Sequence, residues 1–166
     1  MAATYTPIAT TTLGSAATSY TFTSIPTTYT DLILIVNAKN ASTGSYPKMQ
    51  VGNGSVDTGN NYSRTYLTGN GSSASSNRDS NYPFASMAAN ADSGNSFAYT
   101  AIANIMNYSN TSTFKTILVR ANNANYGVDA LVDLWRSTSA INTVKVYADT
   151  NFEIGSTFTL YGIQAA

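Results

Sequence analysis

The chain has 166 residues, with eight basic and eight acidic side chains and neither histidine nor cysteine. Without these two residues, Ser–His–Asp and Cys–His nucleophiles, ordinary zinc sites and disulfide bonds are excluded. The zero net charge and the scattered Lys and Arg argue against binding to nucleic acid. We therefore expect one domain that needs no metal or cofactor and is not an enzyme.

The N-terminus shows neither the cationic region nor the apolar stretch of a signal peptide. The longest strongly apolar run, Leu32 to Val36, is far too short to span a bilayer. We therefore expect synthesis in the cytoplasm and no contact with a membrane.

Thr and Tyr favour strands, whereas Ser and Asn favour turns, and both groups are abundant. Pro7 lacks a backbone N–H, so the first strand is expected at a sheet edge. Leu32 to Val36 is apolar on both faces, which is typical of a central strand. The strands predicted in the first half span residues 5–13, 19–24, 31–39, 48–51 and 62–68.

Two segments are poor in apolar residues and are predicted to be long surface loops, Gly69 to Asn81 and Asn90 to Ser96. Gly-Asn-Gly occurs at residues 52–54 and again at 69–71. Neither copy has the lysine or the strand–helix context of a phosphate-binding loop, so both are predicted to form turns.

Apolar and polar residues alternate more clearly in the second half of the chain. Two of its segments, 97–108 and 128–136, fit helical spacing as well as strand alternation, and we favour strands for both. Three other segments alternate as strands, at residues 114–121, 143–148 and 157–164.

Nine or ten short strands separated by turns predict an all-β fold, a two-sheet antiparallel sandwich with jelly-roll-like connections. A TNF-like, trimer-forming sandwich is one variant, and the sequence leaves the strand order open. We expect residues 1–18 to form an N-terminal arm or edge strand, and residues 19–166 to form a single β-sandwich domain.

Carboxylates are the common catalytic groups that remain, and Asp129 and Asp133 are the closest suggestive pair. On one strand they share a face about 13 Å apart. Glycosidase carboxylates lie roughly 5 to 9.5 Å apart, so this pair does not fit hydrolysis. No Asp-x-Asp-x-Asp-Gly loop indicates calcium, although distant loops such as those of Asp57 and Asp92 could share an ion.

Twelve Tyr and one Trp suit either half-buried strand positions or a recognition surface. Trp135, next to Arg136, could stack on a sugar or anchor the edge of the core. Our candidates for surface recognition are Tyr62, Tyr66, Arg78 and Trp135.

The two ends of the chain carry a family resemblance. The opening YTPIATTTLGSAATSYTFTSIP at residues 5–26, followed by Thr30-Asp31-Leu32, resembles small virion proteins of tailed bacteriophages, particularly phages of cyanobacteria and other aquatic bacteria. The closing WRSTSAI at residues 135–141 and FTLYGI at 158–163 resemble the C-terminal end of the same group. The segment from Ala41 to Thr113 has no such counterpart.

This resemblance implies a structural role in a phage particle, as a head or tail component or a module of a tail fibre. We expect a capsid decoration (cement) protein, trimeric, located in the virion and bound to the major capsid protein or other virion proteins. The few charges also suit an assembly, because they limit repulsion between copies. Candidate assembly contacts lie on the N-terminal arm, at Tyr5, Pro7, Ile8 and Leu13. The alternative is a tail-fibre or tail-tip module that binds host-surface glycans.

Overall fold

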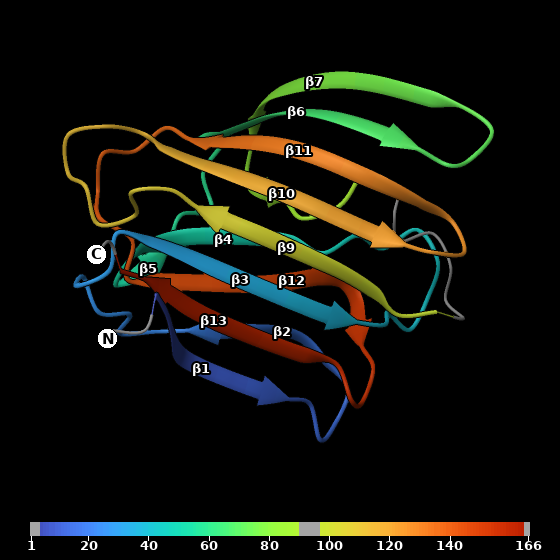
Figure 1. Ribbon diagram of the computed structural model, residues 1–166, viewed down its shortest axis with the longest axis horizontal. Coiled ribbons are helices and arrows are strands. Elements are labelled where there is room, and N and C mark those ends of the chain that lie inside the picture. The colour runs from blue at the N-terminus through green and yellow to red at the C-terminus, as the bar shows by residue number, and fades with distance from the viewer. Residues whose placement is uncertain (1–3, 90–96, 165–166) are drawn as a thin grey trace.

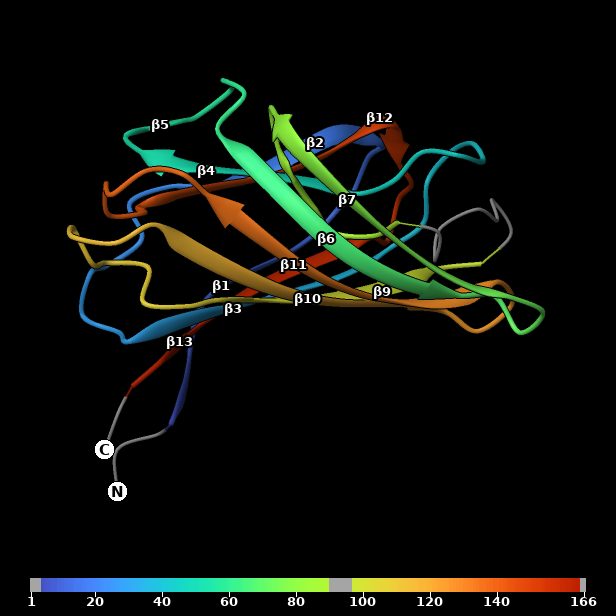
Figure 2. The ribbon, with the colours of Figure 1, turned by 90° about the horizontal axis from the view of Figure 1, so that it is seen from above.

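The computed structural model describes residues 4–89 and 97–164 and confirms the all-β prediction (Figure 1). Two antiparallel sheets pack against each other as a β-sandwich, which Figure 2 shows from above. The predicted loop at residues 90–96 lies outside the described residues. Within the described part of the chain, no helix is long and apolar enough to cross a membrane.

The larger sheet has eight strands in the order β1-β13-β3-β9-β10-β11-β6-β7. Their bounds are β1 (Tyr5–Thr12), β13 (Thr157–Ile163), β3 (Asp31–Ala38), β9 (Tyr99–Ile105), β10 (Lys115–Asn123), β11 (Gly127–Trp135), β6 (Tyr62–Gly69) and β7 (Ala74–Tyr82). Both ambiguous segments of the second half are therefore strands, as predicted.

The smaller sheet has the order β2-β12-β4-β5, with β8 paired to β4 as well. Its strands are β2 (Ala17–Phe22), β12 (Thr143–Phe152), β4 (Lys48–Asn53), β5 (Ser55–Val56) and β8 (Ala85–Ser86). The first Gly-Asn-Gly forms the turn between β4 and β5, where Gly54 has a φ of 79°.

The strand order contains a complete jelly roll. Four strands of the larger sheet (β1-β13-β3-β9) face four of the smaller (β2-β12-β4-β8), and the chain passes between the layers in the sequence that defines this fold. Two excursions are added to it. One carries β5, β6 and β7 between β4 and β8, and the other carries β10 and β11 between β9 and β12. Strands β10, β11, β6 and β7 lie side by side and widen the larger sheet; we call these four strands the extension (Figure 1).

The core lies between the two layers, and alternation determines which side chains enter it. Leu32, Leu34 and Val36 of β3 are fully buried, and Phe158 and Leu160 of β13 pack beside them. Val144 and Val146 of β12 enter from the smaller sheet, as their spacing predicted.

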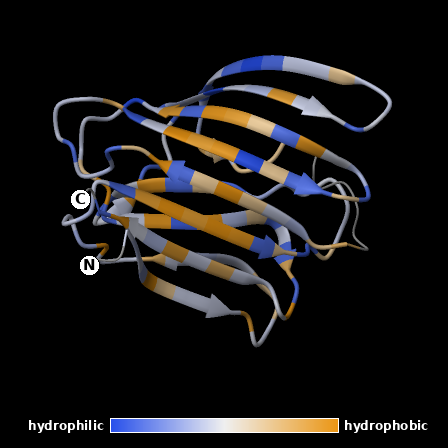
Figure 3. Ribbon diagram, viewed as in Figure 1, coloured by the Kyte–Doolittle hydropathy of each residue, from blue (hydrophilic) through white to orange (hydrophobic). Residues whose placement is uncertain are grey.

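The prediction of a loop over Gly69 to Asn81 is wrong. Residues 74–82 form β7, which pairs with β6 along its length, and only the connection at residues 70–73 is a turn. Asn70 closes this turn, because its Oδ1 accepts hydrogen bonds from the backbone N–H groups of Ser72 and Ser73. As an edge strand, β7 is exposed on most of its residues, so backbone pairing holds it without any hydrophobic alternation. Figure 3 shows the contrast between hydrophilic β7 and hydrophobic β3.

The burial pattern predicts how neighbouring positions of β13 differ in stability. Leu160→Ala removes a fully buried side chain and should lower the free energy of unfolding by about 2–5 kcal/mol. Thr159→Ala, one residue earlier and turned outward, should change it by less than about 1 kcal/mol. Urea denaturation of both variants measures the difference, and equal losses would contradict the assigned faces.

Candidate functional site

The outer face of the eight-stranded sheet, the side turned away from the smaller sheet, is the broadest surface that the fold leaves uncovered. It is apolar at its centre, where exposed or half-buried aliphatic side chains alternate with the buried core residues on successive strands. These side chains are Ile33, Ile35, Leu67, Ile102, Leu118, Val128, Ala130, Val132 and Leu134. Leu118, on β10 in the middle of the sheet, is 45% exposed.

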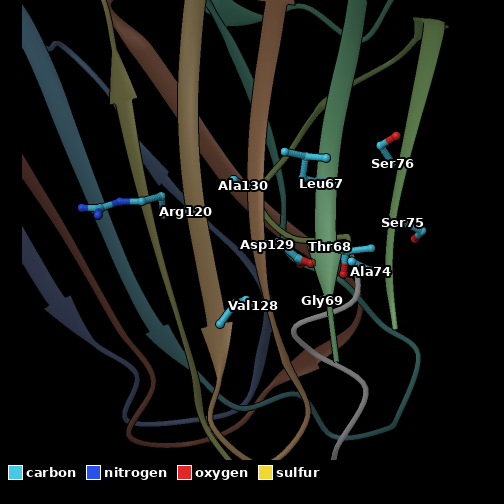
Figure 4. Close-up of a pocket in the computed structure, with 10 residues that line it drawn as sticks. All are labelled: Leu67, Thr68, Gly69, Ala74, Ser75, Ser76, Arg120, Val128, Asp129 and Ala130. Atoms are coloured by element: carbon cyan, nitrogen blue, oxygen red, sulfur yellow. The ribbon is translucent and has the colours of Figure 1, made fainter. Parts of the chain in front are cut away.

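Two open hollows deepen this face over the extension. The larger has a volume of about 600 Å³ and is drawn in Figure 4, with lining residues from β10, β11, β6 and β7, among them Leu67, Val128 and Arg120. The second, of about 470 Å³, shares the same strands and is lined by Thr65, Val132 and neighbouring residues. The hollows are shallow, open parts of a surface, which suits a broad protein contact better than an enclosed ligand.

Charge is scarce on the outer face. The charged residues at outward positions of the eight strands are Asp31, Arg78 and Arg120. The much smaller outer side of the five-stranded sheet carries Lys145 and Lys48, and Lys48 is paired with Asp149. Since protein interfaces are depleted of charge at their centre, the larger sheet presents the better contact surface.

The inner face of the extension is closed by residues 83–89, which include β8; we call this stretch the covering segment. Asp133 Oδ1 accepts the backbone N–H of Ser86 at 2.9 Å, and Asp129 Oδ2 accepts that of Ala89 at 2.7 Å. Both carboxylates come from inward positions of β11 and are buried. The Asp129–Asp133 pair thus shares one face of a strand, as the sequence predicted, and its role here is to hold backbone.

Burial raises the pKa of Asp133 to about 7, although the Ser86 N–H and the nearby Arg64 guanidinium act in the opposite direction. Its Oδ2 has no hydrogen-bond partner among the described residues. This carboxyl group therefore changes its charge near neutral pH while it is enclosed in the fold.

A smaller pocket, of about 220 Å³, opens between the extension and the smaller sheet. We call it the aromatic pocket, because Tyr46, Tyr82 and Phe84 line it together with Lys48 and Arg64. The Arg64 guanidinium lies 4.9 Å from the centre of the Tyr82 ring, and Lys48 Nζ lies 4.9 Å from that of Phe84. Its volume is below the roughly 300–1,000 Å³ of sites for drug-sized ligands.

Both cations of the aromatic pocket are neutralised. Arg64 Nε lies 2.8 Å from Asp79 Oδ2, and a second nitrogen of Arg64 donates to the Ser86 hydroxyl. Lys48 Nζ lies 2.5 Å from Asp149 Oδ1. The pocket therefore offers ring faces and hydrogen-bond donors without a strong net charge, which suits a small neutral polar group better than a phosphate.

The predicted assembly contacts divide into two kinds. Tyr5 and Pro7 are exposed on β1, an edge strand of the larger sheet, and the Tyr5 ring meets that of Tyr161 edge-on. Ile8 and Leu13 are instead partly buried and pack against the core, so they offer less side chain to another protein than Tyr5 and Pro7 do. A β-bulge between Pro7 and Ala9, together with the proline itself, interrupts the edge and disfavours addition of a further strand.

Two of the predicted recognition residues are in the interior. Tyr62 is fully buried, and its hydroxyl bonds with the backbone of Val51. Trp135 is 3% exposed and donates its indole N–H to Asp57 Oδ2 at 2.8 Å, so it anchors the core edge at the end of β11. Surface recognition by this pair is a wrong prediction, because both side chains point inward from strand ends.

The other two recognition candidates remain partly accessible. Tyr66 is half-buried beside the Arg64 guanidinium, and Arg78 stands on the exposed outer side of β7. The structure does not bring them together: Tyr66 faces inward, whereas Arg78 lines the second hollow of the outer face. Sequence reasoning missed Phe84, whose neighbours in the aromatic pocket come from β4, β6 and the end of β7.

Within residues 4–89 and 97–164, no cluster of three or more potential metal-ligating residues occurs. Asp57, considered above as a distant calcium ligand, is occupied by hydrogen bonds from Trp135, Asn61 and Gly59. These bonds lower the pKa of Asp57 despite its partial burial.

No protein-family model matches the chain, and no curated protein matches it. The surfaces described above are therefore the structural basis for a proposed function.

Asp133 makes stability depend on pH in a defined direction. Its folded-state pKa of about 7 lies above the ordinary value of 3.8, so ionisation opposes folding. The penalty is complete above pH 7 and disappears as the pH falls toward 4. The free energy of unfolding should therefore rise by a few kcal/mol from pH 8 to pH 5. Asp133→Asn should largely abolish that rise in urea titrations at both pH values, and an unchanged pH dependence would contradict the assignment.

Proposed function

We propose that this chain is a structural protein of a phage particle, and that it decorates the capsid by bridging neighbouring capsid subunits. The observation that carries the proposal is the outer face of the eight-stranded sheet, which is broad, apolar at its centre and nearly free of charge. Such a face is typical of a protein that works in an assembly. The resemblance of both chain ends to virion proteins of tailed bacteriophages supports the same role.

The fold is compatible with this role. Jelly rolls occur in viral capsid and lectin domains, but a fold alone does not define a function. The described carboxylates support a structural rather than a catalytic role, because Asp129, Asp133 and Asp57 all hold backbone or side-chain N–H groups. In this proposal the protein resides in the virion, forms a homo-oligomer, needs no cofactor and binds neither nucleic acid nor membrane.

Tyr5 is the residue we assign to the capsid contact. It is 58% exposed at the margin of the larger sheet, and tyrosine is enriched in protein interfaces. Pro7 lies next to it on the same exposed side of β1. The contact would use side chains rather than an added strand, because the bulge interrupts this edge.

The test is the number of copies in purified particles, measured by quantitative mass spectrometry against the major capsid protein. A decoration protein should be present in amounts comparable to the capsid protein, whereas a tail component should be present in few copies. Tyr5→Ser should lower the occupancy of particles reconstituted with the purified chain, and Tyr126→Ser, at an exposed turn remote from β1, should not. A few copies per particle, or none, would contradict the decoration role.

A second candidate function is favoured by the aromatic pocket. A tail-fibre or tail-tip module would bind a host-surface glycan there, because sugar rings stack on aromatic faces and their hydroxyls accept from Lys48 and Arg64. Phe84 would supply a stacking surface beside Tyr82, to which its ring lies edge-on at 5.2 Å.

A glycan array separates this candidate from the first. If the pocket binds a glycan, the chain should retain specific array signals that Phe84→Ala reduces about tenfold or more. Phe114→Ala, which removes an exposed phenyl ring outside the pocket, is the matched control and should bind normally. The absence of specific signals from the folded wild-type chain would count against the tail module.

A further inference from the structure

The occupant of the outer face can be inferred from its area, its charges and its symmetry. Eight strands about 4.8 Å apart and four outward rows about 6.7 Å apart give a face of roughly 1,000 Å². A standard protein interface takes about 800 Å² from each partner. The face is therefore large enough for a stable dimeric contact that leaves β1 at its margin free.

The charges on the face are self-complementary. Asp31 on β3 and Arg120 on β10 both occupy outward positions, and pairing of these strands with β9 places Asn104 midway between them. Asp31 Oδ1 also accepts the backbone N–H of Asn107. Consider two such faces that are opposed and related by a two-fold axis in the plane between them. If the axis passes over Asn104 and is perpendicular to the line from Asp31 to Arg120, Asp31 of each copy lies opposite Arg120 of the other. The apolar residues Ile33 and Leu118, which flank Asn104 on the neighbouring strands, then lie at the centre of the contact.

Like-charge repulsion does not oppose this arrangement. Arg78 lies on the edge strand β7, remote from the centre, and the remaining outward positions carry aliphatic, aromatic, hydroxyl and amide side chains or no side chain. Two sheets packed face to face are also the way in which this fold builds its own core. Face-to-face packing of two outer faces would be the same arrangement between two molecules.

We propose that a second copy of this chain packs on the outer face of the eight-stranded sheet, with its own outer face opposed and Leu118 near the centre. This inference rests on the assembly role proposed above and names the partner that covers the face. It is independent of where in a particle the protein resides.

Sedimentation equilibrium of the purified chain tests the contact. The wild-type chain should self-associate, and Leu118→Lys should weaken self-association about tenfold or more, because it places a charge in the desolvated centre. Leu118 is half-exposed in a single copy, so the variant should fold, which circular dichroism checks. Thr21→Lys, on the outer side of the smaller sheet, is the matched control and should associate like wild type.

A cross-linking measurement gives an independent readout. Since the chain has no cysteine, a single introduced thiol reports its own surroundings. Asn104→Cys should give a cross-linked dimer with a bis-maleimide that spans the roughly 10 Å between packed sheets. Thr21→Cys should not. A folded wild-type chain that stays monomeric, self-association that Leu118→Lys leaves unchanged, or cross-linking from Thr21→Cys alone would each overturn the inference.

The outcomes distinguish this inference from the virion role. A monomeric chain that is nevertheless abundant on capsids would overturn the self-association and leave the decoration role intact. A chain that self-associates through Leu118 but is absent from particles would overturn the decoration role and leave the self-association intact.

Discussion

Hydrogen bonds from the covering segment to two buried carboxylates of β11 make the wide sheet possible. The extension adds β10, β11, β6 and β7 to a jelly roll whose smaller layer ends at β8 and β5, so its inner face needs another cover. Asp129 and Asp133 accept N–H groups of the covering segment and hold it against that face. Buried backbone N–H groups need acceptors, and carboxylates are strong acceptors. When Asp133 is ionised, however, this arrangement places a charge inside the fold. The raised pKa of Asp133 is the measurable consequence.

Widening the sheet also creates the surface on which the proposed function depends. The inner side of the extension is closed by the protein itself, whereas the outer side continues the apolar surface of β3 and β9 onto β10 and β11. The two sides of β11 show this division clearly, because its carboxylates point inward and Val128 and Val132 point outward. We propose that a partner covers this apolar outer side. Two ion pairs, Lys48–Asp149 and Arg64–Asp79, instead flank the aromatic pocket.

Much of the fold follows from alternation in the sequence. The inward sets of β12 and β13, such as Val144 and Phe158, could be predicted because apolar and polar residues alternate at these positions. Strand β7 could not, because an exposed edge strand has no buried face and its Ser and Asn also favour turns. The apolar residues on both faces of β3 predict a central strand, and β3 is one, although among the described residues only its inner face is covered.

The sites were less predictable than the fold. Side-chain type alone suggests surface recognition for Tyr62 and Trp135, but their positions at strand ends direct both into the core. For Trp135 the alternative, an anchor at the edge of the core, is confirmed. The aromatic pocket combines residues from β4, β6, β7 and the covering segment, which are distant in sequence and meet only through the order of the strands. The outer face is likewise assembled by pairing, since Ile33, Asn104 and Leu118 become neighbours through registers that no local pattern specifies.

The most direct test of the account is a cryo-electron microscopy reconstruction of intact particles in which this chain is located. The account predicts density in many symmetric copies on the capsid shell, with the outer faces of the eight-stranded sheets opposed between neighbouring copies and β1 turned toward the capsid. Density confined to the tail, or copies on the shell whose outer faces are exposed to solvent, would contradict it.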